Sequence, residues 1–575
     1  MKRKLLWVGA ALLATGVAYL QTTTTDRPLA GLIPTGALAY AEARNLNGLL
    51  REWNTSAVKS DWLTSANFSV FANSNLYQKL SGVFEQYAAA AGFKPDLAAV
   101  IGMAGDRSAI AMYELREVEF LAITRLGERQ LLSSRIWAVR DKFQQRRSGK
   151  YTFYLRRDPG SGRTVAFAFV EGHLFLATRD DLVARALALL SGAAEPSIAG
   201  DAWYRDPVAQ RPAAGELRMV LNLEMLVRST YFRSYWIQRN ASAVAQYRAG
   251  LADLDRTANQ ITERRLFLRA GNDRAQPASQ ADLARLVALV PPAAGLYRGT
   301  VSPPAAEVAA LIEAKLLAPT PPTSRYGDYS APYAASMDGT SGSETDLEER
   351  IDEAPINPAV AGSVNIGPVQ ALLTTASPRA VMLVQRSATA TGEFWVSTPS
   401  LLIASAGASS WNASQLREAF STAIDSYLTT SRLGVRWAAR QTPAGSIETM
   451  TGLARLSFAI RGPLLFVAND EALLADSLSR TARPPAAPAG PTYWAGFRHG
   501  QERDRYDRLM TALDSAHESP RFGIAGFFRG GEQTPFFFSD NLASLSQTLN
   551  FVSEVELQRT DSAASVTEQV MYRLR

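Results

Sequence analysis

The amino-acid sequence predicts an α+β protein in which one module of antiparallel strands and covering helices occurs twice in tandem, after an N-terminal transmembrane anchor. Three observations support this prediction: a cationic and apolar N-terminal segment, short motifs that recur in the same order, and strand-like runs that alternate with helical patterns. The chain has 575 residues, of which 47% are apolar, and this is enough for two to four domains with cores of their own.

The first 21 residues are expected to form a signal anchor in the inner membrane of a bacterium. Residues 2–4 are all Lys or Arg, and the apolar run at residues 5–20 spans roughly 24 Å as a helix. Residues 18–20, Ala-Tyr-Leu, do not place small side chains at the alternating positions of a cleavage site, which favours an uncleaved anchor. Because the cationic end stays in the cytoplasm, the rest of the chain would lie in the periplasm.

Two copies of the module are expected at residues 29–270 and 286–575, joined by a linker at 271–285. The recurring segments, in order, are 31–34 and 288–291, 167–177 and 457–467, and 261–263 and 566–568. The second pair aligns without a gap. The offset between the copies grows from 257 to 290 to 305 along the chain, as expected of one repeat that has acquired two insertions.

Short turns between the strands of each copy predict an antiparallel sheet with helices on one face. A Leu-Ile-Pro-like strand would open each copy. In the first copy we expect further strands at 109–115, 118–124, 151–156, 165–170 and 174–178, and helices at 76–91 and 128–145. In the second copy we expect strands at 380–385, 394–397, 435–440, 455–460 and 464–468, and a helix at 414–429. An acidic pair, Asp180-Asp181 or Asp470-Glu471, marks a further helix start in each copy.

Residues 319–358 interrupt the second copy. They are dominated by Pro, Ser, Thr, Gly, Asp and Glu, so they cannot bury enough apolar surface to offset the entropy of ordering. We therefore expect a disordered insertion. Oxygen-bearing side chains gather at 338–346, but the alternating acidic spacing of a calcium loop is absent.

Composition excludes several kinds of site. The chain has no cysteine, which rules out disulfides, thiolate metal sites, a Cys nucleophile and a lipoprotein anchor. The histidines are His173, His499 and His517, and none has a companion at metal-ligand spacing, so no metal or cofactor is expected. The net charge of +6 is small for this length, and no nucleic-acid partner is expected.

One pair of short motifs raises the alternative of a serine hydrolase. Ser56-Ala57-Val58-Lys59 and Ser539-Asp540-Asn541 match two motifs of penicillin-recognising enzymes, in which the Lys deprotonates a nucleophilic Ser. The third motif, a Lys-Thr-Gly strand, is missing, and the two fragments fall in different copies. We therefore assign no catalytic residues.

Three other segments combine aromatic or apolar side chains with basic ones. They are 231–236, flanked by Arg228 and Arg239, the Phe-rich stretch 527–538 around Gly530-Gly531, and the basic helix expected at 128–145. Core packing or a solvated face is the simplest interpretation. A membrane, glycan or protein interface is the alternative for the aromatic segments, and acidic lipid headgroups are the alternative for the basic helix.

The Leu-Ile-Pro motif after the anchor, the hairpin at 171–178 and the tail at 540–546 resemble a family of exported bacterial proteins classed as a domain of unknown function. This resemblance implies an anchored envelope protein and supplies no catalytic residues. We expect a non-enzymatic periplasmic interaction or scaffold protein, held to the inner membrane by residues 5–20 and bound to another envelope protein. A carrier of a lipid or other apolar ligand is the alternative.

Overall fold

The computed structural model describes residues 27–73, 75–229, 244–271, 281–317, 364–386, 388–389, 396–397, 399–407, 410–428, 435–451, 455–482, 490–502 and 551–575. Helices and antiparallel strands both occur throughout, which confirms the α+β class. The expected anchor at 1–21 and the expected insertion at 319–358 both lie outside these residues. No helix in the described part of the chain is long and apolar enough to cross a membrane.

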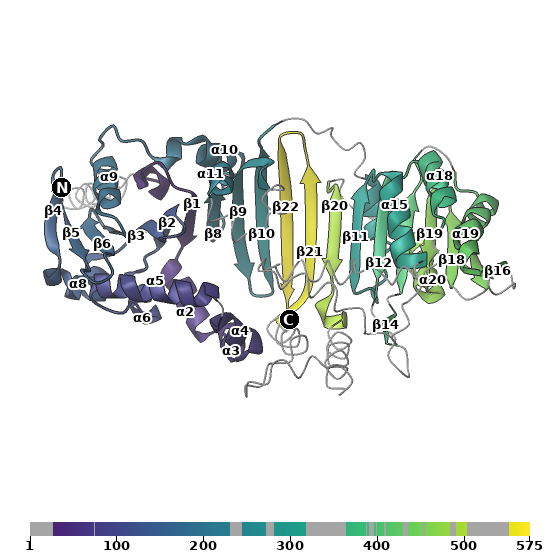
Figure 1. Cartoon of the computed structure of the whole chain (residues 1–575), viewed down its shortest axis with the longest axis horizontal. Coiled ribbons are helices and arrows are strands. Elements are labelled where there is room, and N and C mark those ends of the chain that lie inside the picture. Colours follow the sequence, from purple (N-terminus) through teal and green to yellow (C-terminus); the bar gives the residue numbers. More distant parts are fainter. Residues whose placement is uncertain are drawn as a thin grey trace, which may run out of the picture. The chain divides into compact units, whose positions relative to one another are not determined.

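The described chain divides into two compact units (Figure 1). Unit 1 contains the residues up to Arg51, Ser81–Pro212 and Met219–Asn222. Unit 2 contains Glu52–Leu80, Ala213–Arg218 and Leu223–Arg575. This division lies ahead of the linker expected at 271–285, because the strands just before that linker pair with the last strands of the chain.

Unit 1 contains an antiparallel sheet with the strand order β1-β2-β3-β7-β6-β5-β4. The strands are β1 (Ala39–Arg44), β2 (Arg107–Glu114), β3 (Glu119–Arg125), β4 (Gln144–Ser148), β5 (Tyr151–Arg157), β6 (Thr164–Val170) and β7 (His173–Ala177). β8 (Leu217–Leu221) pairs with the other side of β1.

Unit 2 contains an antiparallel sheet with the order β9-β10-β22-β21-β20-β11-β12-β15-β19-β18-β17-β16. The strands are β9 (Tyr247–Thr257), β10 (Gln260–Arg269), β11 (Leu296–Val301), β12 (Ala380–Gln385), β15 (Ser400–Ser405), β16 (Arg436–Thr442), β17 (Gly445–Thr451), β18 (Leu456–Arg461), β19 (Leu464–Ala468), β20 (Tyr493–Phe497), β21 (Val552–Asp561) and β22 (Ser565–Leu574). The stretch from β11 to β16 has the same order of connections as β1 to β4 in unit 1.

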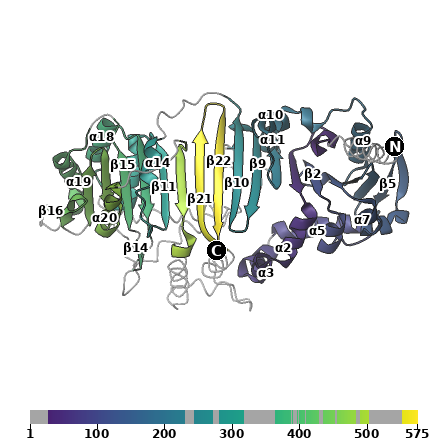
Figure 2. The same ribbon diagram turned by 180° about the vertical axis from the view of Figure 1, so that it is seen from behind.

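Helices cover both faces of the β11–β16 part of the sheet, whereas we expected them on one face. α15 (Ala305–Ile312), η4 (Glu313–Leu317), α18 (Gly367–Ala376) and α19 (Ala413–Leu428) pack on one face. α14 (Ala281–Val287) and α20 (Glu471–Ser479) pack on the other (Figure 2). Every residue of β12 and β15 is buried because neighbouring side chains point into the two opposite cores.

In unit 1, one core lies between the sheet and the end of α5 (Asn75–Ala91), together with α7 (Glu128–Leu132) and α8 (Arg135–Ala138). α9 (Asp180–Leu190) packs on β6 and β7. The remaining helices are α2 (Leu46–Thr55), α3 (Ala57–Thr64), α4 (Ala66–Ala72), α6 (Leu97–Met103), α10 (Ala202–Gln210) and α11 (Leu223–Arg228), with 3-10 turns η1 (Leu29–Leu32), η2 (Arg140–Lys142), η3 (Ile198–Gly200) and η6 (Arg480–Ala482).

The long helix expected at 128–145 is wrong. The segment forms α7, α8 and η2 and ends in the strand β4. The Ser134 hydroxyl donates to the Leu131 carbonyl at 2.6 Å and accepts from the Trp137 amide at 3.4 Å, so it ends one helix and caps the next. A serine that bonds to its own backbone competes with a continuous helix.

Four smaller expectations also need correction. The Leu-Ile-Pro motif forms the buried turn η1 and its exit, and β1 begins only at Ala39. Residues 394–397 were expected to form the sheet strand after β12, but β15 takes that place. Val396–Ser397 pairs instead with Ala388–Thr389 in a separate two-stranded sheet. β17 lies between 440 and 455, where no strand was expected. Residues 281–285 of the expected linker belong to α14, where Leu283 is buried.

Strand pairing moves the alignment of the two hairpins by one residue. Phe167 pairs with Leu176, and Phe458 pairs with Val467, so Phe167 occupies the place of Phe458 and not of Ser457. The turn residues are 171–172 in one hairpin and 462–463 in the other. The offset at this point is therefore 291 and not 290.

Candidate functional site

The Ser-x-x-Lys segment serves as a helix start. The Ser56 hydroxyl accepts from the Lys59 amide at 3.2 Å and donates to the Trp53 carbonyl at 2.8 Å, which makes Ser56 the N-cap of α3. The Lys59 ammonium donates to the Asn54 side chain at 2.7 Å. These two polar groups thus have structural partners, and the structure does not bring the Lys59 Nζ to the Ser56 Oγ.

His173 opens β7, directly after the two-residue turn. Its Nδ1 lies 2.9 Å from the Glu171 carbonyl oxygen, and burial lowers the pKa of the imidazole despite that contact. In the part of the chain that the structure describes, no group of three His, Asp or Glu side chains could hold a metal ion. The segments 231–236, 338–346, 527–538 and 539–546, together with His517, lie outside the described residues.

The most unusual surface lies on the helices that follow β1. α2 and α3 contain no buried residue. Trp53, Leu63, Phe71 and Leu80 expose between 36% and 47% of their surface. A helix of a folded protein normally buries its apolar stripe, so an apolar face left in water is typical of a binding surface.

Four aromatic rings interlock on the same helices, and we call them the aromatic cluster: Trp62, Phe68, Phe71 and Tyr77. The centroid distances are 6.0 Å for Trp62–Phe68, 6.3 Å for Trp62–Phe71, 6.3 Å for Phe68–Tyr77 and 5.3 Å for Phe71–Tyr77. Most of these contacts are edge-to-face, the favoured geometry for aromatic pairs. The cluster therefore holds α3, α4 and α5 together and gives them a shaped outer surface.

An ion-pair network within unit 2 binds Glu52, in the second half of α2, to β9. Arg256 on β9 donates to Glu216 at 2.6 Å and to Glu52 of α2 at 3.0 Å. The Glu216 hydrogen bond, followed by the Glu52 bond, raises the pKa of Arg256 despite partial burial. The contact positions the start of the helices that carry the aromatic cluster.

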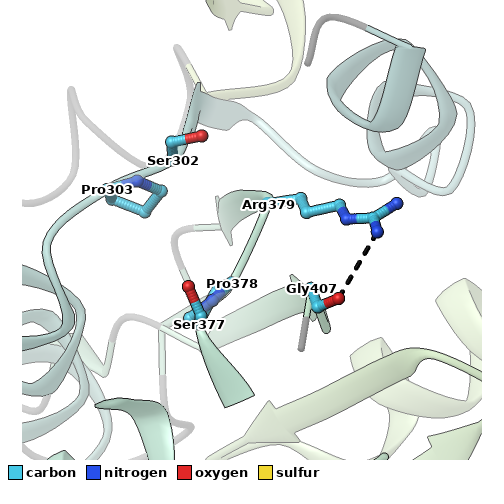
Figure 3. A pocket seen from close by; sticks show the side chains of 6 residues that line it. All are labelled: Ser302, Pro303, Ser377, Pro378, Arg379 and Gly407. Atoms are coloured by element: carbon cyan, nitrogen blue, oxygen red, sulfur yellow. Dashed lines mark hydrogen bonds between the residues drawn. The ribbon is translucent and has the colours of Figure 1, made fainter. Parts of the chain in front are cut away.

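A surface pocket of about 340 Å³ lies in unit 2 at one end of β11 and β12 (Figure 3). It is lined by Ser302, Pro303, Ser377, Pro378, Arg379 and Gly407. Both serines have a φ of +45°, and the Arg379 guanidinium donates to the Gly407 carbonyl at 3.4 Å. A side chain at Gly407 would meet the Ser377 carbonyl oxygen at 2.3 Å, so glycine is required there.

Sequence periodicity did not find the exposed helical surface. It placed Leu80, Phe84 and Tyr87 on one face of a helix at 76–91, and α5 does form there. Leu80 and Phe84 are nevertheless exposed. The length of the segment between β1 and β2 could have indicated this surface. It holds five helices, and one sheet edge cannot cover the apolar faces of all five.

Comparisons with known proteins leave the family open. No family model matches the sequence, and no curated protein matches it. Three crystal forms of the protein TP0453 are similar at a TM-score of 0.24 and 10% identity. Forms I, IV and III cover 43%, 41% and 44% of this chain, and 80%, 79% and 83% of the matched chains. The resemblance to an exported family of unknown function stays a prediction.

Proposed function

We propose that this chain is a non-enzymatic interaction protein of the cell envelope, built from two divergent copies of one module. The observation that carries the proposal is that α2 and α3 bury no residue while the helices from α2 to α5 carry exposed Trp, Phe and Leu side chains. The expected anchor at residues 5–20 would hold this surface on the periplasmic side of the inner membrane.

The order of the strands supports the duplication. β1-β2-β3-β7-β6-β5-β4 and β11-β12-β15-β19-β18-β17-β16 use the same connections, and β8 beside β1 corresponds to β20 beside β11. Asn45 after β1 and Ser302 after β11 both have positive φ, at 52° and 45°. The simplest explanation of eight strands in the same order, with the same conformation after the first strand, is that both halves descend from one ancestral module.

The chemistry of the helical surface favours a protein as the partner. Residues 52–80 contain two basic and two acidic side chains, so their charge does not select an anionic membrane. Trp, Tyr and Phe are the side chains that dominate the centres of protein–protein interfaces. Because the rings hold one another in place, little side-chain entropy would be lost on binding.

Photocrosslinking in intact cells tests this proposal. A photoreactive phenylalanine analogue at Leu63 of the full chain should give one discrete adduct with an envelope protein. The matched control is the analogue at Met219, an exposed apolar position on β8, which should give none. The change Phe71→Glu should remove the Leu63 adduct. Lipid adducts alone, or an adduct that survives Phe71→Glu, would refute the protein-binding surface.

A further inference from the structure

Positive charge is concentrated in one stretch of unit 1. Ten of the 33 residues from Arg125 to Arg157 are Arg or Lys, and two are acidic. The net charge of this stretch is +8, which exceeds the +6 of the whole chain. This stretch includes the basic helix expected at 128–145, for which acidic lipid headgroups were the alternative interpretation.

The fold gathers these residues at one end of the unit 1 sheet. Apart from Arg125, which ends β3, and Lys150, which lies in the turn between β4 and β5, they belong to α7, α8, η2, β4 and β5. β4 pairs only with β5 among the described strands, so it is an edge strand. The first four residues of β4 are exposed, including Arg146 and Arg147. We call the exposed side chains of this stretch the basic edge: Arg129, Arg135, Lys142, Arg146, Arg147, Lys150 and Arg157.

Few acidic groups offset this charge. Arg135 lies 3.4 Å from Asp96, and Lys150 lies 3.8 Å from Glu171. Among the residues that the structure describes, Arg129, Lys142, Arg146, Arg147 and Arg157 form no ion pair. Exposed ion pairs such as Arg135–Asp96 and Lys150–Glu171 contribute little stabilising energy, so their cations can readily take another anionic partner. The basic edge therefore keeps most of its positive field.

An apolar side chain stands among these cations. Leu132 exposes 54% of its surface, the largest fraction among the large apolar side chains that are exposed in the described chain. In the sequence it lies between Arg129 and Arg135. Nearby, the Arg140 guanidinium stacks 4.9 Å from the centre of the half-buried Trp137 ring. Cations around an apolar tip are typical of a membrane interface, where the headgroups pair with the charges and the tip enters the acyl boundary.

We propose that the basic edge docks on a bilayer that contains anionic phospholipids. The charge complementarity supplies long-range attraction, and Leu132 supplies a contact that nucleic-acid phosphates would not require. This inference goes beyond the protein-binding surface on α2–α5 and does not depend on it, since no residue is shared.

The absence of cysteine in the sequence allows a single environment-sensitive fluorophore to be placed at Leu132→Cys in the full chain. The labelled protein is reconstituted in vesicles of phosphatidylcholine alone or with phosphatidylglycerol. With phosphatidylglycerol, we expect blue-shifted emission that brominated lipids quench and that 0.5 M salt reverses. The same fluorophore at Thr374→Cys, an exposed position on α18, should not respond.

Charge removal gives the quantitative arm of the test. Arg147→Gln should lower the ratio of docked to free edge about fivefold, and adding Arg129→Gln should lower it about 25-fold, from about 1 kcal/mol per basic residue at an anionic surface. Arg285→Gln, at an exposed position on α14, is the matched control and should change nothing. Emission that ignores lipid charge, or that shifts with a DNA duplex instead of vesicles, would overturn the proposal.

Discussion

At the residue scale, the most buried ion pair of the described chain holds the start of β8 to β9. The Arg218 guanidinium donates to both Asp253 oxygens, at 2.7 and 2.8 Å, and the two side chains are 4% and 2% exposed. The Gly215 amide also donates to Asp253 at 3.2 Å. At the place in β20 and β21 that the proposed duplication makes equivalent, Trp494 lies opposite Gln558, so the ion pair is not repeated there.

Asp253→Ala should lower the free energy of unfolding by about 3–5 kcal/mol, because it leaves a buried guanidinium without its partner. Chemical denaturation of the full chain measures this change. Glu224→Ala, which removes the exposed pair with Arg228, is the control and should cost less than about 0.5 kcal/mol. Equal losses in the two variants would contradict the structural role of Asp253.

His173 gives a pH-dependent prediction. Burial lowers the pKa of the imidazole in the folded chain. Below about pH 6.5 the unfolded state therefore binds more protons than the folded state, and the free energy of unfolding decreases as the pH is lowered. His173→Leu, which copies Leu464 at the equivalent hairpin position, should remove this part of the loss. Chemical denaturation at pH 5 and pH 8 measures the loss in the native protein and in the variant. His499 is present in both proteins, so its contribution cancels in the comparison. An identical pH dependence would contradict the assignment.

At the element scale, the cap matters to α3 because the helix has no buried residue and contacts its neighbours mainly through Trp62 of the aromatic cluster. Ser56→Ala should destabilise the helix by about 1 kcal/mol and speed amide exchange at residues 57–64. Ser56→Asp restores a capping oxygen and should exchange like the native chain. A fluorophosphonate that labelled the native protein at Ser56 would instead support the hydrolase alternative.

Sequence patterns found the short apolar runs that are buried on both faces and the helices with acidic starts. β12 and β19 were predicted at their observed bounds, and the acidic starts at 180 and 470–471 mark α9 and α20. β4 was missed because its sequence, Gln-Gln-Arg-Arg-Ser, has no apolar alternation; only pairing to β5 makes it a strand.

The candidate site was harder to predict than the fold. Helical periodicity shows that a face is apolar, but it carries no information on whether another element covers that face. The pattern therefore placed Leu80 and Phe84 on one apolar face, but it could not show that this face is exposed. The basic residues of the edge were recognised in the sequence, but they were placed on one continuous helix at 128–145, whereas the structure places part of them on the edge strand β4.

At the scale of the whole molecule, the sheet of unit 2 contains a seam between strands that are far apart in the sequence. β10 pairs with β22 over nine residues, from Gln260 opposite Arg573 to Leu268 opposite Ser565, and Arg264 faces Gln569 at its centre. Arg269 and Asp561 bridge the same region at 2.7 Å. The seam joins the last strand expected for the first copy to the last strand of the second.

The pair Arg264→Cys and Gln569→Cys should oxidise to a disulfide, because directly opposite Cα atoms lie about 4.5–5.5 Å apart in an antiparallel sheet. The bond should stabilise the chain by about 2–4 kcal/mol. Mass spectrometry of peptides detects the bond. Arg264→Cys with Ser565→Cys, four residues out of register, is the control, and a bond in that pair alone would contradict the observed pairing.

The seam also has a consequence for biosynthesis. The open side of β10 stays without its partner while about 300 further residues are made, since β22 begins at Ser565. A nascent strand with free amide and carbonyl groups invites pairing with neighbouring polypeptides. The ribosome therefore releases an unfinished sheet that is exposed to aggregation until β22 is made. Depletion of chaperones should raise aggregation of this chain before it affects proteins whose sheets close sooner.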